Sequence, residues 1–369
     1  MKKFTTLLFG SFLSMAFAQA PATYYDGTAG LTGYALKTKL NQIISNGASD
    51  LGYNALWTTY KTSDVDIYYE NNGSLLDMYS EKPSGPDSYE FRIGSSGSGG
   101  NQCGSTNNNF EGFCYNREHT LPQSFFGGSG AAPMVNDGHF VVPTDYYVNN
   151  RRSNYSYGEV ASPTFTSTNG SKLGTNTFPG YGGVVFEPID EFKGDLARMQ
   201  LFFITRYEDK LLDFVSYQSD QNPLDGTVNR GYKQWFINLM LKWAVQDPVS
   251  LKEMDRNNAV AARQGNRNPF IDHPEWVFQI WTSTLSTGET ANFSKKISIY
   301  PNPVRNGELN LSGYGLEEVK KVQIYSMDGK LLQTSPFNQK NTSKIILKNR
   351  DKGVYMLKTE NQSAKFIVE

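Results

Sequence analysis

The sequence of 369 residues contains only two cysteines and three histidines. Neither Cys103 nor Cys114 has a neighbour at the spacing of a zinc site, so a structural zinc is not predicted. After the N-terminal segment, no run reaches the ~18 consecutive apolar residues of a membrane-spanning helix, and we expect no membrane span. The glycine-rich segment 94–100 lacks the Lys and Ser/Thr of a phosphate-binding P-loop, so we interpret it as a connector.

Positive charge is scarce before residue 292. Residues 292–369 contain 13 Lys+Arg and 7 Asp+Glu, a net of +6. Because the whole chain carries −1, residues 1–291 carry −7. An acidic main domain does not favour tight binding of nucleic acid, so any contact with phosphates must come from a local cluster or a metal.

The first residues have the pattern of an export signal. Lys2 and Lys3 precede an apolar run from Leu7 to Phe17, and Ala16-Phe-Ala18 supplies a cleavage site after Ala18. We therefore expect a signal peptide at 1–18 and a secreted or cell-surface protein. In an exported protein the two cysteines can pair across a short loop, although two separate buried thiols remain an alternative.

The length predicts two folded units, because a single core stops growing near ~250–300 residues. Residues 283–293 are small and polar and read as a linker between domains at 21–282 and 294–369. In the first domain, apolar spacing predicts helices at 30–45, 195–207, 231–245 and 248–264. In the second, short β-favouring runs separated by turns predict a small β-sandwich, with strands near 297–300, 308–311, 322–325, 344–347, 354–357 and 366–368.

Two neighbouring segments, Cys114-Tyr-Asn-Arg-Glu-His-Thr-Leu-Pro-Gln123 and Asp137-Gly-His-Phe-Val-Val-Pro-Thr144, contain two of the three histidines. The second segment continues into Asp145-Tyr-Tyr-Val-Asn-Asn-Arg-Arg-Ser-Asn154. We expect a strand over 140–142 that Pro143 ends, then a short helix from Asp145 to about Arg152 with Thr144 as its N-cap. The pattern is strand, strand, helix.

These side chains match the needs of phosphodiester hydrolysis. His119 can accept a proton from water near neutral pH, so it is the candidate general base. Glu118 and Asn149 offer hard oxygen ligands for Mg²⁺ or another divalent cation such as Ca²⁺ or Mn²⁺. Asn149 and Arg152 lie three positions apart and would share a helix face. For His139, a structural hydrogen bond is the preferred interpretation over direct catalysis.

Five motifs in order resemble the endonuclease I family of bacterial nucleases across residues 25–282. They are Asn116-Arg-Glu-His-Thr-Leu-Pro122, Asp137-Gly-His139, Val148-Asn-Asn-Arg-Arg-Ser-Asn154, Gly194-Asp-Leu-Ala-Arg198 and Gln264-Gly-Asn-Arg-Asn-Pro-Phe-Ile271. The resemblance implies an α+β fold: a ββα-metal nuclease domain with added helices, here followed by the small all-β sandwich. It also implies hydrolysis of DNA, and often of RNA, with little sequence preference and 5′-phosphate ends. His119 would be the general base, and Glu118 and Asn149 the metal ligands.

One departure from the family concerns its arginine. The family places an arginine that contacts the scissile phosphate between its Glu-His and Asp-x-His motifs, but residues 120–136 contain no Arg or Lys. Arg117, Arg152 and Arg198 are the candidates for this role, and Arg117 and Arg152 are the two that we assign to the catalytic site. The alternative function is a catalytically degenerate nuclease fold that acts as a surface adhesin or a nucleic-acid-binding module.

The C-terminal residues resemble the sorting domain of the type IX secretion system. The segments that carry the resemblance are Ile299-Tyr-Pro-Asn-Pro-Val304, Ile324-Tyr-Ser-Met-Asp-Gly-Lys330, Gly353-Val-Tyr-Met-Leu-Lys358 and Lys365-Phe-Ile-Val368. The resemblance implies an address tag that is recognised by the secretion machinery, with a generic adhesion sandwich as the alternative. We expect the protein to be a monomer.

Overall fold

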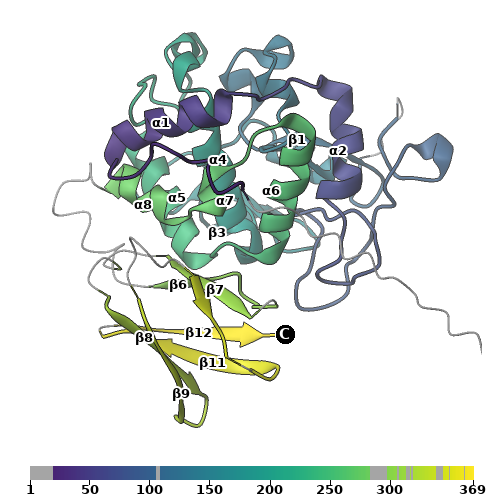
Figure 1. Cartoon of the computed structure of the whole chain (residues 1–369). Coiled ribbons are helices and arrows are strands. Elements are labelled where there is room, and N and C mark those ends of the chain that lie inside the picture. The colour runs from purple at the N-terminus through teal and green to yellow at the C-terminus, as the bar shows by residue number, and fades with distance from the viewer. Residues whose placement is uncertain are drawn as a thin grey trace, which may run out of the picture.

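The computed structural model describes residues 20–104, 109–282, 297–305, 307–312, 316, 319–337, 344–348, 350–360 and 362–369. The predicted signal peptide and linker therefore lie outside the described residues. Helices and short sheets make up the first part, and strands make up the C-terminal part, as Figure 1 shows. The expected α+β class with an all-β C-terminal region is confirmed. Within the described residues, no helix has the length and apolar character needed to cross a membrane.

The first part is built around helix α4. Nearly every side chain of α4 (Lys193–Arg206) is buried, and the helix packs against α5 (Gln234–Gln246). The other helices are α1 (Gly33–Ser45), α2 (Leu56–Ser63), α3 (Tyr146–Arg152), α6 (Leu251–Gln264), α7 (Pro269–Asp272) and α8 (Glu275–Trp281). The four predicted helices are confirmed, with ends displaced by up to three residues.

Helix α6 begins and ends on strong local signals. Ser250 accepts a hydrogen bond from the backbone N–H of Glu253, and the Glu253 carboxylate accepts one from the backbone N–H of Ser250. This reciprocal capping box satisfies two donors that a helix start leaves free. Gly265 closes the helix at φ 85°, a left-handed conformation that glycine adopts without a steric penalty.

Two sheets belong to the first part. Strands β1 (Tyr115–His119) and β2 (Val141–Asp145) form an antiparallel pair, and β3 (Val160–Thr166), β4 (Lys172–Asn176) and β5 (Val184–Glu187) form an antiparallel meander. The meander was not predicted from the sequence. Its first strand is mostly exposed and contains Pro163, a residue that argues against a strand inside a sheet.

The C-terminal part consists of two antiparallel sheets over one core. One sheet contains β6 (Ser298–Tyr300), β7 (Glu308–Ser312) and β10 (Lys344–Ile346). The other contains β8 (Lys321–Ser326), β9 (Leu331–Pro336), β11 (Gly353–Lys358) and β12 (Ser363–Val368). The six predicted strands are confirmed, and β9 was missed. Tyr300 packs against Val249 and Ile271 of the first part.

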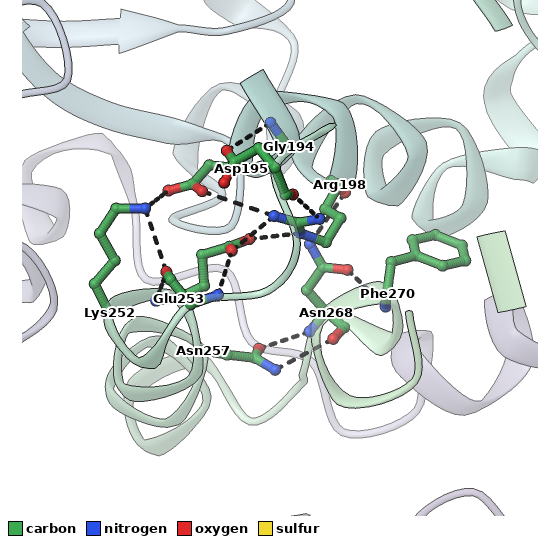
Figure 2. A network of polar contacts seen from close by, with 10 residues as sticks. Gly194, Asp195, Arg198, Lys252, Glu253, Asn257, Asn268 and Phe270 are labelled. Carbon is green, nitrogen blue, oxygen red and sulfur yellow. Dashed lines mark hydrogen bonds and ion pairs between the residues drawn. The ribbon is translucent and has the colours of Figure 1, made fainter. Parts of the chain in front are cut away.

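A buried charge network joins α4 to the start of α6, as Figure 2 shows. The guanidinium of Arg198 donates to both oxygens of Glu253 at 2.6 and 2.7 Å, and Lys252 contacts Asp195 at 2.7 Å. Arg198 is 1% exposed and also donates to the carbonyl of Asp247. Arg198 is therefore a structural residue in this network, which leaves it unsuited to contact a substrate phosphate.

Removing the Arg198 guanidinium should be costly because Glu253 would stay buried without its partner. We expect Arg198→Met to lower the free energy of unfolding by roughly 3–5 kcal/mol in urea denaturation. The control Lys172→Met breaks the 3.7 Å ion pair of a half-exposed lysine with Glu187. It should lower the free energy of unfolding by less than about 1 kcal/mol. Equal losses in the two variants would contradict a structural role for the network.

Candidate active site

Strands β1 and β2 hold the two central side chains in register. Glu118 lies opposite Val142, and His119 lies opposite Val141. Helix α3 follows β2 directly and packs back on both strands. The strand–strand–helix unit therefore brings residues 118–119 and 149–152 together over a short stretch of chain.

The expected junction between β2 and α3 was wrong in two details. Pro143 and Thr144 continue the strand instead of ending it, and the N-cap is Asp145, whose carboxylate accepts from the backbone N–H of Val148 at 2.8 Å. The backbone N–H of Thr120 donates to the carbonyl of Phe140, and that of Tyr146 donates to the carbonyl of Cys114. These two bonds show which opposite residues of β1 and β2 are hydrogen-bonded to each other and which are not. Pro143 then falls at a position that needs no N–H donor, so a proline fits within this strand.

All five predicted site residues line one pocket of about 220 Å³. Its wall consists of Tyr53, Asn116, Arg117, Glu118, His119, Pro122, Gln123, Asn149, Arg152, Ser153 and Asn154. Glu118 and His119 thus open into a common cavity even though they are neighbours on a strand. Their chemical roles stay a prediction at this point, but the geometry allows them to act on one substrate.

Glu118 is held by a buried cation. Arg152, 1% exposed, contacts Glu118 Oε1 at 3.0 Å and donates to the backbone carbonyls of His119 and Thr120. The hydroxyl of Tyr79 donates to the same Oε1 at 2.9 Å. Burial raises the pKa of Glu118, while the charge of Arg152 and the hydrogen bond from Tyr79 oppose this rise. Among the described residues, none hydrogen-bonds to Oε2, so this oxygen can accept a ligand.

His119 is fixed as a neutral base. Its Nε2 lies 3.1 Å from the carbonyl oxygen of Val135, which can only accept, so Nε2 carries the proton and Nδ1 has the lone pair. Burial lowers the pKa of His119 to about 4, and the positive charges of Arg117 and Arg152 act in the same direction. The imidazole is therefore unprotonated at neutral pH.

Asn149 is oriented by a second asparagine. Its Nδ2 donates to Asn116 Oδ1 at 2.9 Å, and Asn116 belongs to β1. This bond leaves Asn149 Oδ1 without a hydrogen-bond partner in the described part of the chain. Asn149 Oδ1 and Glu118 Oε2 are two hard oxygen donors in one pocket, a set that suits Mg²⁺, Ca²⁺ or Mn²⁺.

Arg117 differs from Arg152 in exposure and contacts. It is half-buried, donates to the carbonyl of Tyr53, and its guanidinium carbon lies 3.4 Å from the centre of the Tyr53 ring and 4.3 Å from that of Trp57. An aromatic ring stacks on the flat face of a guanidinium, so the N–H groups at the guanidinium edge stay free to bind an anion. Of the three arginines considered, Arg117 is the one with an accessible charge at the pocket.

Two residues of the site were missed from the sequence. Tyr79 reaches Glu118 from a segment 39 residues earlier, and Tyr53 stacks on His119 with ring centres 5.9 Å apart. Both belong to a stretch rich in tyrosine, so no pattern singled them out. The disulfide between Cys103 and Cys114, expected as one of two alternatives, is formed and anchors the start of β1. His139 bonds to the Asn266 carbonyl at 2.8 Å, as its structural interpretation expects.

Comparisons with known proteins agree with these motifs. The family model for endonuclease I matches residues 32–275, and the model for the secretion system C-terminal sorting domain matches residues 298–369. An extracellular ribonuclease of Bacillus subtilis (strain 168) is 32% identical over 277 residues, which cover 74% of this chain and 84% of that protein. An extracellular ribonuclease of Bacillus amyloliquefaciens is 34% identical over 262 residues, which cover 70% and 78%.

The three histidines should titrate in two separate ranges. Burial lowers the pKa of His119 and of His139 to about 4. Burial also acts to lower the pKa of His273, but the hydrogen bond and charge of Glu275 raise it above its usual value. In a ring-proton NMR titration we expect two histidines that remain neutral at pH 6 and one that is largely protonated. A His119 pKa near 6.5 would contradict the buried, neutral site.

Proposed function

Since the chain belongs to the endonuclease I family and is a secreted nuclease, we propose that it cleaves phosphodiester bonds of both DNA and RNA with little sequence preference. The observation that carries this proposal is the single pocket that holds Glu118, His119, Asn149 and Arg117. These groups can contact phosphate and water, which DNA and RNA share. The two relatives, named as ribonucleases, favour RNA as one substrate.

Export agrees with such a role. The sorting domain at the C-terminus and the extracellular relatives place the protein outside the cell or on its surface. We propose that the secretion machinery recognises residues 294–369 and that the domain at 21–282 acts on nucleic acid as a monomer. The described residues contain no membrane-spanning helix. Because residues 1–291 carry a net −7, substrate binding should be weak and local to the pocket.

A divalent metal fits the pocket. Members of the family generally depend on a divalent metal, and Glu118 Oε2 and Asn149 Oδ1 are the oxygen atoms that would hold one here. Such an ion would neutralise charge that develops on the phosphate and on the leaving oxygen. The 3.0 Å contact with Arg152 orients Glu118 and favours its ionised form, while burial, the larger effect, raises its pKa.

His119 accounts for the proton that the attacking water must lose. His119 Nδ1 removes a proton from the attacking water while Nε2–H stays bonded to Val135. A pKa of about 4 is low for this task in the free site, but the negative phosphate of a bound substrate raises it as the reaction proceeds. Water oxygen then bonds to phosphorus, the bond to the 3′ oxygen breaks, and the 3′ oxygen takes up a proton from solvent. The product carries a 5′-phosphate and a 3′-hydroxyl.

Plasmid and RNA degradation tests the proposed reaction. We expect the mature protein to cut both substrates with Mg²⁺ and to lose activity in EDTA, because the metal supplies the charge stabilisation. His119→Ala should lower kcat by at least about 100-fold with little change in KM, because proton transfer to a positioned base contributes on the order of 10²–10⁴. Folded protein that binds either nucleic acid but cuts neither would support a degenerate binding module instead.

Arg117 should be the arginine that contacts the scissile phosphate. We expect Arg117→Met to lower kcat/KM by about 100-fold, the usual order for losing one charged contact to a transition state. The matched control is Arg151→Met on α3, which removes the same charge from a side chain that lies over Phe165. It should change kcat/KM by less than about threefold, and equal losses in the two variants would show that only net charge matters.

A further inference from the structure

A second group of carboxylates lies outside the pocket. One oxygen from each of Asp66, Glu70 and Glu81 lies within 4.8 Å of the others. Asp66 and Glu81 are each 1% exposed, and Glu70 is partly exposed. None of the three forms an ion pair with a lysine, arginine or histidine in the part of the chain that the structure describes. Three acidic groups are therefore packed together without a compensating protein charge.

The strongest sign of a missing partner is Glu81. Its Oε1 is buried and has no hydrogen-bond partner among the described residues. One oxygen of the same carboxylate lies among the carboxylates of Asp66 and Glu70. An unpaired buried carboxylate oxygen is costly, because burial removes its water and supplies nothing instead.

Backbone hydrogen bonds hold the Asp66 carboxylate in place. Asp66 Oδ1 accepts from the backbone N–H groups of Tyr68 and Tyr69, and Oδ2 accepts from that of Glu70, each at 3.0 Å. These bonds hold the 66–70 turn and direct the Glu70 side chain back toward Asp66. The position of the Asp66 carboxylate is therefore fixed by the backbone before any ion binds.

We propose that Asp66, Glu70 and Glu81 bind a divalent cation, with calcium as the ion that this site suits. Ca²⁺ takes oxygen ligands at ~2.3–2.6 Å, so oxygens around one ion lie within ~5 Å of each other, as they do here. Three carboxylates, one of them partly exposed, leave room for waters or carbonyls to complete its coordination. The cation neutralises the repulsion and gives Glu81 Oε1 its partner.

The site connects to the catalytic pocket through one short turn. Glu81 follows Tyr79 by two residues, and the backbone N–H of Glu81 donates to the carbonyl of Asp77. Tyr79 donates to Glu118 Oε1, and Tyr69, on the other arm of the site, donates to Glu191. A cation that joins residues 66–70 to Glu81 therefore holds the turn that positions Tyr79 on the catalytic carboxylate.

Calorimetric titration of the full chain with Ca²⁺ tests the site. We expect Glu81→Gln to bind one Ca²⁺ fewer per chain than the unaltered protein, or to bind that ion at least tenfold more weakly. The control Glu90→Gln removes an exposed charge nearby and should keep the number of ions. Asn149→Ala should affect only a different ion, so the failure of one site is distinguishable from that of the other. Unchanged binding by Glu81→Gln would overturn the proposal.

Thermal unfolding separates a cation site from a plain structural role. In EDTA we expect Glu81→Gln to have a Tm equal to or above that of the unaltered protein, because the substitution relieves repulsion. In Ca²⁺ the order should reverse, because only the unaltered protein gains the bound ion. A Glu81→Gln Tm that is lower in EDTA, or a Ca²⁺ gain equal to that of the unaltered protein, would also overturn the proposal.

Discussion

The guanidinium of Arg152 holds the site together. From the last turn of α3 it donates to one carboxylate oxygen of Glu118 and to the carbonyls of His119 and Thr120, so one side chain joins the helix to the end of β1. A fully buried cation is costly unless a close anion and further acceptors pair with it, as Glu118 and the two carbonyls do here, with only Nε left without a partner among the described residues. The position of α3, and with it Asn149, follows from that requirement. The orientation of Glu118 follows as well, since its Oε1 is occupied and its Oε2 is left to the pocket.

Three arginines differ in burial and therefore in what they can contact. Arg152 and Arg198 are each 1% exposed and bind carboxylates, whereas Arg117 lies half-buried between Tyr53 and Trp57 at the pocket. A nucleic acid can reach only the third of these charges. In the proposed function, this arrangement reconciles an acidic domain with a polyanionic substrate, because Arg117 and the proposed metal site take the place of a broad basic surface. It also offers a substitute for the arginine that residues 120–136 lack.

Much of this organisation could be predicted from the sequence because the site is local. Residues 114–123 and 137–154 form one strand–strand–helix unit, so motif spacing and strand propensity sufficed to bring Glu118, His119 and Asn149 together. The N-cap was misplaced because Pro143 reads as a strand end, and only the hydrogen-bond alternation shows that it needs no N–H. Tyr79 and the group of Asp66, Glu70 and Glu81 could not be found this way, since they depend on how a turn-rich segment folds back on the core.

The most direct test of the central claim is a crystal structure of His119→Ala soaked with Mn²⁺ and a short oligonucleotide. Anomalous scattering locates the metal, and loss of the base preserves the substrate. The account predicts Mn²⁺ bound between Glu118 and Asn149, with a phosphate that contacts both the ion and Arg117. A metal and phosphate bound elsewhere, with the pocket of Glu118 and Asn149 empty, would contradict it.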